Sequence, residues 1–276
     1  MKHILLLGTG GTIACKHGDS GLTPLLTGDE LLSYVPAARS FCEVQAIQVL
    51  NIDSTNIHPK HWQLLCHVLE ENYDNYDGFV ICHGTDTMAY TAAAMSYLVQ
   101  HSKKPIVITG AQKPIDLDVT DARTNLLDSL RFASCERAHG VNIVFDGKVI
   151  AGTRGKKERT KSYNAFSSIN FPYLAVIQDE HILFYIDDKW QDRENGRFYH
   201  GLDDRVALLK LIPSMESSIL DYMGEHYDAV VIESFGVGGL PSYESGDFYH
   251  SIEKMTQAGK IVVMTTQVTQ EGSNMS

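Results

Sequence analysis

The feature that most constrains the fold of this chain is the alternation of short apolar runs with segments of helical periodicity. Four runs have the length of a buried strand, at residues 4–7, 44–50, 78–82 and 106–109, and polar turn residues follow the last two at once. Helical patterns occupy residues 59–73, 87–100 and 121–137. Strands and helices in alternation build a mostly parallel sheet with helices on both faces, so we expect an α/β fold.

A hairpin and a polar segment complete the expected organisation. Residues 141–145 and 149–152 flank Asp146-Gly147, a dipeptide typical of two-residue hairpin turns. Residues 187–201 are polar and lack periodicity, which indicates a linker. The chain is therefore expected to form a larger N-terminal α/β domain (1–186), the linker (187–201) and a smaller C-terminal parallel α/β domain (202–276).

The C-terminal domain repeats the alternation on a smaller scale. Strands are expected at residues 206–211, 229–233 and 261–265. We expect Ser214 to cap a helix that runs towards Gly224, and Gly259 to end a second helix at residues 247–258.

Composition excludes several classes of protein. Hydrophobic residues make up 43% of the 276, which argues against disorder, and the net charge of −11 disfavours nucleic acid or an anionic membrane as a partner. No apolar stretch approaches the ~20 residues of a membrane helix, and the apolar run near the N-terminus is too short for a signal peptide. Five cysteines, odd in number and without a CxxC pair, indicate free thiols in a reducing compartment. We therefore expect a cytoplasmic protein.

A glycine-rich turn, GTGGTIA at residues 8–14, follows the first expected strand. Such a turn can bind the pyrophosphate of a dinucleotide, but that site needs a helix directly after the glycines. Residues 15–21 (CKHGDSG) form a poor helix with two more glycines, which favours a long mobile loop. A tight turn without a ligand is the other interpretation.

A second polar cluster, HGTDT at residues 83–87, lies where the third expected strand ends. Ligands of open α/β sheets bind at the carboxyl ends of the strands. Thr85 or Asp86 could also simply cap the following helix, since both residue types favour the N-cap. That interpretation explains one polar residue and leaves four others crowded against the strand end.

Together these segments resemble the signatures of the bacterial-type L-asparaginase family. Residues 9–14 (TGGTIA) are similar to the first signature and residues 78–88 (GFVICHGTDTM) to the second. The resemblance continues through residues 51–55, 105–112, 152–154 and 234–239, so it covers essentially the whole chain, and it is most similar to the type I, cytoplasmic branch. It implies hydrolysis of L-asparagine in the larger domain, without a cofactor or metal, by a homodimer or homotetramer.

The resemblance also implies catalytic roles. Thr12 would be the nucleophile that forms an acyl-enzyme, because a threonine hydroxyl activated by a base or proton relay can attack an amide. Thr85, Asp86 and Lys157 would form a second polar triad that positions and activates the attacking group. Lys156 is adjacent to Lys157, so an alignment shifted by one residue would select it instead. Without the resemblance, the basic run at residues 155–161 would be interpreted as exposed surface.

Substrate binding is assigned in the same way. Asp53 and Ser54 would bind the amino-acid head of the substrate, and Asp86 would also face its ammonium. Two carboxylates around one cation fit a zwitterionic ligand. The remaining substrate contacts would come from Gly11, Gly84 and Ala111, and backbone N–H groups of the two turns could stabilise an oxyanion.

Three features depart from the family pattern. Leu22 stands where many relatives have a loop tyrosine, so a tyrosine from elsewhere, Thr23 or water would have to relay the proton. Glu233 and Val268 replace the arginine and cysteine of the regulatory asparagine site in type I relatives, which argues against allosteric asparagine binding. Relatives continue for several tens of residues beyond the last expected strand, so we expect apolar surface on residues 261–265 and lower stability than in an extended chain.

Two other functions fit the same residues. A catalytically weak relative could bind asparagine or aspartate as a sensor. An amidase domain could serve a larger transamidation complex, as in archaeal tRNA amidotransferases, although those chains carry an extra N-terminal segment. His58 and His61 have metal-like spacing, but no further ligand in the sequence completes a site, which favours a surface position.

Overall fold

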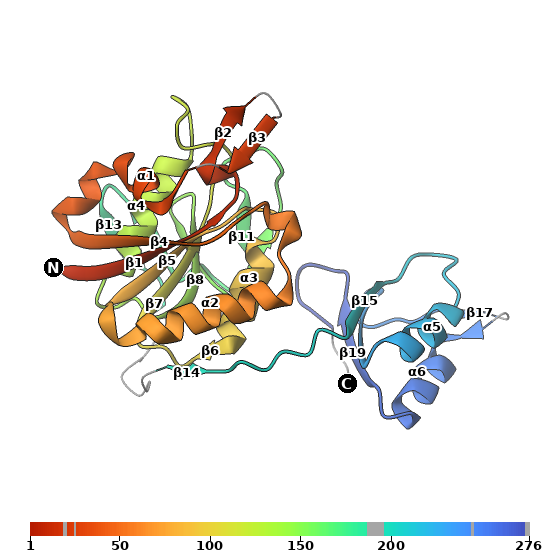
Figure 1. Cartoon of the computed structure of the whole chain (residues 1–276). Coiled ribbons are helices and arrows are strands. Elements are labelled where there is room, and N and C mark those ends of the chain that lie inside the picture. Colours follow the sequence, from red (N-terminus) through yellow and green to blue (C-terminus); the bar gives the residue numbers. More distant parts are fainter. Residues whose placement is uncertain (19–20, 25, 187–195, 244–245, 274–276) are drawn as a thin grey trace. The chain divides into compact units, whose positions relative to one another are not determined.

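The computed structural model describes the chain except for residues 19–20, 25, 187–195, 244–245 and 274–276, with backbone alone at 16–18, 21–24 and 246. It contains two compact units, Met1–Gly201 and Leu202–Ser276, each with its own sheet and core (Figure 1). The expected fold, two α/β units with a larger, mostly parallel N-terminal sheet, is confirmed. Among the described residues, no helix has the length and hydropathy to cross a membrane.

The first unit is built on an eight-stranded sheet with the order β13-β12-β9-β8-β7-β5-β1-β4. Its parallel part consists of β4 (Cys42–Ile52), β1 (Lys2–Gly10), β5 (Gly78–Cys82), β7 (Pro105–Thr109) and β8 (Gly140–Phe145). Antiparallel strands β9 (Lys148–Ala151), β12 (Ala175–Gln178) and β13 (His181–Phe184) extend it. The expected hairpin is β8–β9, and Asp146 and Gly147 at its turn both have positive φ.

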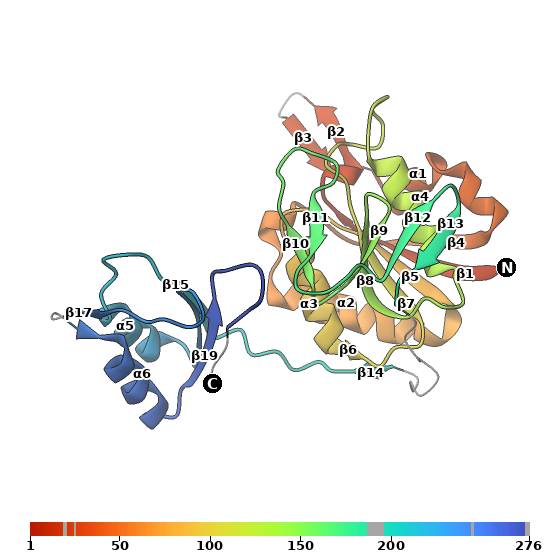
Figure 2. The same cartoon turned by 180° about the vertical axis from the view of Figure 1, so that it is seen from behind.

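Helices cover both faces of this sheet, as Figures 1 and 2 show. One core contains side chains of α1 (Gly28–Ser33) and α4 (Ala122–Ala133), and the other contains side chains of α2 (Pro59–Asn72) and α3 (Met88–Leu98). Ile4 enters the first core and Leu5 the second. Because both faces of the central strands are buried, these strands are continuous apolar runs in the sequence.

Short elements connect the sheet to its edges. The described residues of the first unit also form two-stranded pairs: β2 (Cys15–Gly18) with β3 (Gly21–Pro24), β10 (Gly155–Lys157) with β11 (Phe166–Ser168), and β6 (Val99–Gln100) with β14 (Arg197–Phe198). The 3-10 helices are η1 (Thr12–Ala14), η2 (Pro36–Ser40), η3 (Ser54–Asn56) and η4 (Tyr73–Asn75). Both η1 and η3 directly follow strands of the parallel sheet.

Two segments differ from the sequence-based expectation of irregular structure. The segment after the glycine-rich turn forms the hairpin β2–β3, in which cross-strand hydrogen bonds satisfy the backbone that a loop would leave to water. The expected linker is partly strand, because Arg197 pairs with Gln100 and Phe198 with Val99. Residues 187–195 of that linker lie outside the described residues.

Three helix boundaries also differ. The helix expected to reach Gln100 ends at Leu98, since residues 99–100 pair with β14 instead. The helix expected to reach Arg137 ends at Ala133, where the Ser134 hydroxyl donates to the Leu130 carbonyl. Ser214 is not a cap: it has a φ of 70°, and the helix begins at Ser218 with Ser217 at the N-cap.

In the residues that the structure describes, the second unit contains a three-stranded parallel sheet with two helices on one face. Its strands are β15 (Val206–Lys210), β16 (Ala229–Ser234) and β19 (Ile261–Thr266), in the order β15-β16-β19. The helices α5 (Ser218–His226) and α6 (Phe248–Gln257) share a core with Leu209, Val230 and Ile232, and β17 (Ser242–Tyr243) pairs with β18 (Gly246–Asp247). On the other face, Leu208 and Ile261 are 58% and 62% exposed. This unit therefore has an apolar sheet face that no described helix covers.

Candidate active site

The predicted site residues lie at the carboxyl edge of the parallel strands. Gly11 and Thr12 follow β1, Asp53 and Ser54 follow β4, and the 83–87 segment follows β5. Since β5, β1 and β4 are neighbours in the sheet, the three turns meet at one edge. The Thr9 hydroxyl, which is buried, donates to the Cys82 carbonyl at 2.8 Å and ties the ends of β1 and β5 together.

The turns that carry Thr12 and Thr85 are in direct backbone contact. Gly11 has a φ of 77°, and a β-carbon there would lie closer than 3.0 Å to the α-carbon of Gly84. Only glycine both adopts this positive φ without strain and lacks the β-carbon that would collide with Gly84. The Gly11 N–H donates to the Ile52 carbonyl at 3.1 Å, so Gly11 contributes close approach to this site rather than a hydrogen-bond donor.

A lysine side chain joins the second turn. Lys157 Nζ donates to Thr85 Oγ1 at 2.7 Å and to Asp86 Oδ1 at 2.6 Å. The Lys157 side chain is 18% exposed, whereas Asp86 is 58% exposed. Lys156, its neighbour on β10, is exposed, because successive strand residues point to opposite faces. The structure thus brings Lys157, and not Lys156, to Thr85.

The Asp53-Ser54 pair adjoins both turns. The Asp53 carboxylate accepts hydrogen bonds from the Thr55 backbone N–H and hydroxyl at 2.8 and 2.7 Å, which lower the pKa of Asp53, so it is ionised at neutral pH. A β-carbon on Gly84 would lie 2.6 Å from Ser54 Oγ. The Thr87 hydroxyl donates to the Ser54 carbonyl at 2.7 Å, which fixes η3 against the turn after β5.

His83 is buried in the same turn and belongs to a chain of hydrogen bonds. Its Nδ1 lies 2.7 Å from the Gly84 carbonyl and its Nε2 lies 2.9 Å from Thr91 Oγ1, which also accepts from Trp62 Nε1. A carbonyl only accepts, so Nδ1 carries the proton and Nε2 accepts from the Thr91 hydroxyl. Burial lowers the pKa of His83 to about 4, so the ring is neutral at pH 7 and stiffens the turn.

Gln112 is a contact of Thr85 that the sequence reasoning missed. Its side-chain oxygen lies 3.4 Å from Thr85 Oγ1, and its Nε2 donates to the carbonyls of Arg159 and Ser162, both at 3.2 Å. Gln112 therefore links Thr85 to the loop that follows Lys157. Its position after the strand next to β5 in the sheet was the available signal.

The turn that carries Gln112 is held by two residues of the α4 region. The Asp121 carboxylate accepts from the backbone N–H groups of Gln112 and Lys113, and Asn125 donates to the Gly110 carbonyl. Asp121 and Asn125 together therefore clamp this turn. Ala111 is buried in the first core, so only its backbone can face a ligand.

Other sequence features lie apart from this group. The side chain of Leu22 lies outside the described residues. His58 and His61 form a reciprocal cap at the start of α2, in which His61 Nδ1 accepts from the His58 N–H at 3.0 Å.

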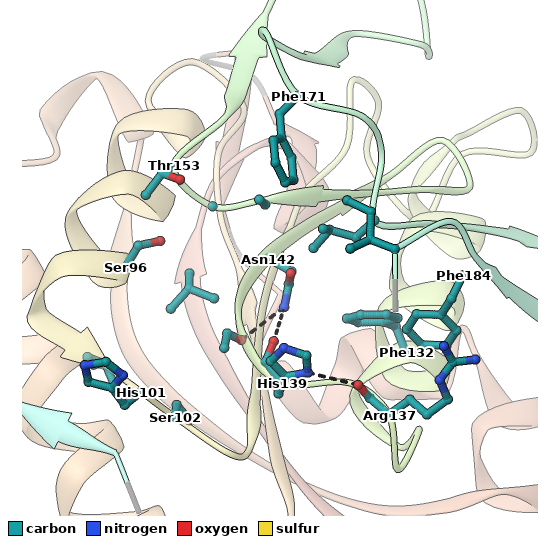
Figure 3. A pocket seen from close by; sticks show the side chains of 17 residues that line it. Ser96, His101, Ser102, Phe132, Arg137, His139, Asn142, Thr153, Phe171 and Phe184 are labelled. Carbon is teal, nitrogen blue, oxygen red and sulfur yellow. Dashed lines mark hydrogen bonds between the residues drawn. The ribbon is translucent and has the colours of Figure 1, made fainter. Parts of the chain in front are cut away.

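A cavity of about 480 Å³, shown in Figure 3, lies near the start of β8, between Phe132, Phe171, Asn142 and Thr153. No residue named above for the active site lines it.

Comparisons with known proteins agree along the whole chain. The family model "Asparaginase, N-terminal" matches residues 3–190, and "Glutaminase/Asparaginase C-terminal domain" matches residues 205–276. The L-asparaginase of Thermococcus kodakarensis is 34% identical over 274 residues, which are 99% of this chain and 82% of that protein. A glutamyl-tRNA(Gln) amidotransferase subunit of Pyrococcus furiosus is also 34% identical, over 96% of this chain and 62% of its own length.

Solved structures show the same relationship. The thermostable L-asparaginase from Thermococcus kodakarensis superimposes with a TM-score of 0.92 at 33% identity, covering 99% of this chain and 82% of that one. L-asparaginase I from Vibrio cholerae superimposes with a TM-score of 0.89 at 29% identity, covering 100% of this chain and 84% of that one. A probable cytoplasmic L-asparaginase from Campylobacter jejuni superimposes with a TM-score of 0.82 at 26% identity, covering 97% of this chain and 84% of that one. This chain belongs to the asparaginase family, in its type I branch.

Proposed function

We propose that this protein hydrolyses the side-chain amide of L-asparagine to L-aspartate and ammonia, with Thr12 as the nucleophile. The observation that carries the proposal is the hydrogen-bonded group of Thr85, Lys157 and Asp86, held beside the Thr12 turn by the packing of Gly11 against Gly84. This arrangement supplies a hydroxyl nucleophile and a proton relay at the carboxyl edge of the sheet.

The proposed reaction has two steps. Thr12 Oγ1 attacks the amide carbonyl carbon, the C–N bond breaks, and the nitrogen leaves as ammonia after it receives the proton from the Thr12 hydroxyl. Water then attacks the aspartyl ester, the bond to Thr12 Oγ1 breaks, and the hydroxyl is restored as aspartate leaves. Thr85 and Lys157 would move the proton in both steps, and the 2.7 Å between their polar atoms supports this role.

The substrate head group would be held by charge. Asp53 is ionised at neutral pH, and one oxygen of Asp86 is bonded to Lys157, which leaves its other oxygen for an ammonium. With the head group fixed there, the extra methylene of glutamine would move its amide away from Thr12, and small misplacements are costly. We therefore expect a higher kcat/KM for asparagine than for glutamine, and comparable values would refute this geometry. Succinamic acid, which lacks the ammonium, should be a poor substrate.

Removal of the Thr12 hydroxyl tests the proposal directly. Thr12→Ala should lower kcat for ammonia release by at least ~1000-fold with the circular dichroism spectrum unchanged, because only the attacking group is lost. Mass spectrometry of the wild type with a slow substrate should find an acyl adduct on Thr12. If the variant kept more than about a tenth of the activity, another nucleophile would be at work, since tenfold is only ~1.4 kcal/mol.

A second candidate function is amidase activity within a transamidation complex, which the similarity to the amidotransferase protein of Pyrococcus furiosus favours. In that case the purified chain would release little ammonia alone and would require a partner protein. A third candidate function, binding of asparagine or aspartate without turnover, predicts saturable ligand binding and no release of ammonia.

We further propose that the protein is cytoplasmic and forms a homo-oligomer, a dimer or tetramer. Sedimentation of the purified protein would test the oligomeric state.

A further inference from the structure

A cluster of two histidines and a glutamate lies on the outer side of α2. His67 and Glu70 are three residues apart on this helix, so they project from the same face, and both are exposed. His200 comes from the segment that follows β14, far away in the sequence. One donor atom of each residue lies within 4.8 Å of the others. None of the residues proposed for asparagine hydrolysis belongs to this cluster.

The backbone around His200 is held on α2 and α3 by several contacts. The Tyr199 N–H donates to the Leu98 carbonyl at 2.8 Å, and the Tyr199 carbonyl accepts from Cys66 Sγ at 3.5 Å. Gln63, one turn before His67, donates from Nε2 to the His200 carbonyl at 2.8 Å. These bonds need no ion, so the chain itself places His200 beside His67 and Glu70. A site that is assembled in this way loses little entropy when it binds an ion.

The side chains already interact with one another. His200 Nε2 lies 2.9 Å from Glu70 Oε2, and the His67 and His200 rings are stacked with centroids 4.2 Å apart and an interplanar angle of 7°. Two parallel rings cannot both point a lone pair at one ion. His67 is exposed, so its ring can turn about the side-chain bonds and displace only water. Metal binding would thus require rotation of the His67 ring out of the stack, starting from donor atoms that already lie within 4.8 Å of one another.

The second ring nitrogen of His200 is the unusual feature. His200 Nδ1 is buried and has no hydrogen-bond partner among the described residues. Buried polar atoms in folded proteins nearly always have a partner, and an exception in a polar cluster points to a bound water or ion. Nε2 is the nitrogen that faces Glu70, so His200 would ligate an ion shared with Glu70 through an unprotonated Nε2, with the proton on the buried Nδ1.

The neighbouring thiol is not a fourth donor. The Cys66 thiol donates to the carbonyls of Tyr199 and Leu98, at 3.5 and 3.7 Å, so its hydrogen is already engaged by the backbone. A metal binds the thiolate. The donor set is then two imidazoles and a carboxylate, which is typical of a three-ligand zinc site with water in the fourth position. Imidazole nitrogen also suits Ni²⁺ and Cu²⁺.

We propose that His67, Glu70 and His200 bind one divalent transition-metal ion, with Zn²⁺ as the reference ion. The ion fastens the last residues of the first unit to α2. It is a structural site, separate from the residues proposed for hydrolysis. An ion that binds only the folded chain raises its stability by RT ln(1 + [L]/Kd), where [L] is the free ion concentration.

The test is calorimetric titration of the full chain with ZnCl₂ after dialysis against EDTA. We expect one ion per chain, a raised Tm, and a Co²⁺ derivative with the visible absorption of a four-coordinate site. His200→Ala should weaken Zn²⁺ binding at least tenfold and abolish the rise in Tm, and Glu70→Gln should weaken it as well. His181→Ala removes an exposed histidine of β13, outside the cluster, and should bind Zn²⁺ as the wild type does.

Two outcomes would overturn the proposal. Equal Zn²⁺ affinity in wild type and His200→Ala would show that the ion binds elsewhere, among scattered surface histidines. Absence of saturable binding would show that Glu70 and His200 are only an ion pair. Ammonia release by the EDTA-treated protein is measured in parallel and should not depend on Zn²⁺, so failure of the metal site and failure of the proposed hydrolysis give different results.

Discussion

Gly11 and Gly84 pack backbone against backbone, so that a β-carbon on Gly84 would lie only 3.2 Å from the α-carbon of Gly11. The two turns come from β1 and β5, which are neighbours in the parallel sheet. Their contact sets the separation of Thr12 from Thr85, and the side chain of Lys157 then completes the group. The spacing of the proposed catalytic hydroxyls thus depends on two residues without side chains.

Gly84→Ala should reduce activity without unfolding the protein. The new methyl group would lie 2.6 Å from Ser54 Oγ, so the turn after β5 must shift away from η3. A displacement of ~1 Å at a reacting group can cost ~100-fold in rate, and we expect a loss of that size in kcat/KM. Gly201→Ala, where a β-carbon meets nothing within 4 Å, is the matched control and should keep full activity. Similar activity of the two variants would show that the Gly11–Gly84 contact does not set the geometry.

Thr85→Val and Lys157→Met should each lower kcat strongly, and the double variant should be little worse than either. Lys157 Nζ and Thr85 Oγ1 are 2.7 Å apart, and residues that act as one unit have non-additive effects. Lys156→Met is the control, because Lys156 is exposed on the opposite face of β10. Steady-state rates of ammonia release are compared among the wild type, the two single variants, the double variant and the Lys156→Met control. Fully multiplicative losses would mean that the two side chains work separately.

His83 should make stability fall as the pH drops from about 6.5 to about 4. Its pKa is about 4 in the folded chain and ~6.5 when unfolded, so the unfolded chain binds the extra proton in this window and is favoured. The full effect is about 3 kcal/mol, since each pKa unit is worth ~1.4 kcal/mol, and it is complete below pH 4. His83→Asn keeps a donor for the Gly84 carbonyl but does not titrate, so its urea-unfolding free energy should decline less over this range. NMR of the imidazole nitrogens should show neutral His83 at pH 5, and a protonated ring there would contradict the prediction.

The open sheet face of the second unit should promote self-association. Leu208 and Ile261 are 58% and 62% exposed on it, and exposed apolar patches of this kind favour association. Leu208→Thr and Ile261→Thr should reduce association in sedimentation experiments and change the free energy of unfolding by only ~0.5 kcal/mol, because threonine keeps strand propensity. Leu209→Thr, on the buried face, should lower Tm clearly. If association persisted in the first two variants, another surface would be responsible.

Local patterns in the sequence were sufficient for the central strands and most helices. The runs at 78–82 and 106–109 match β5 and β7 closely, because strands buried on both faces must be apolar throughout. Asp146-Gly147 predicted the β8–β9 turn, since both residues tolerate positive φ. The signatures around Thr12 and Thr85 identified the family, and the strand order seen in the structure brings their two turns together.

Contacts between distant residues decided the rest, because no local preference encodes them. Residues 99–100 leave the helical pattern only because β14 pairs with them. Lys157 rather than Lys156 contacts Thr85 because the pairing of β10 with β11 fixes which face each lysine occupies. The contacts of Gln112 with Thr85 and of His200 with Glu70 were not predicted, since each joins segments that are tens of residues apart in the chain. Apolar periodicity and turn chemistry are enough to predict the core strands and the motifs that end them. Which side chains meet depends on the register of elements far apart in the chain, and local preferences do not encode that register.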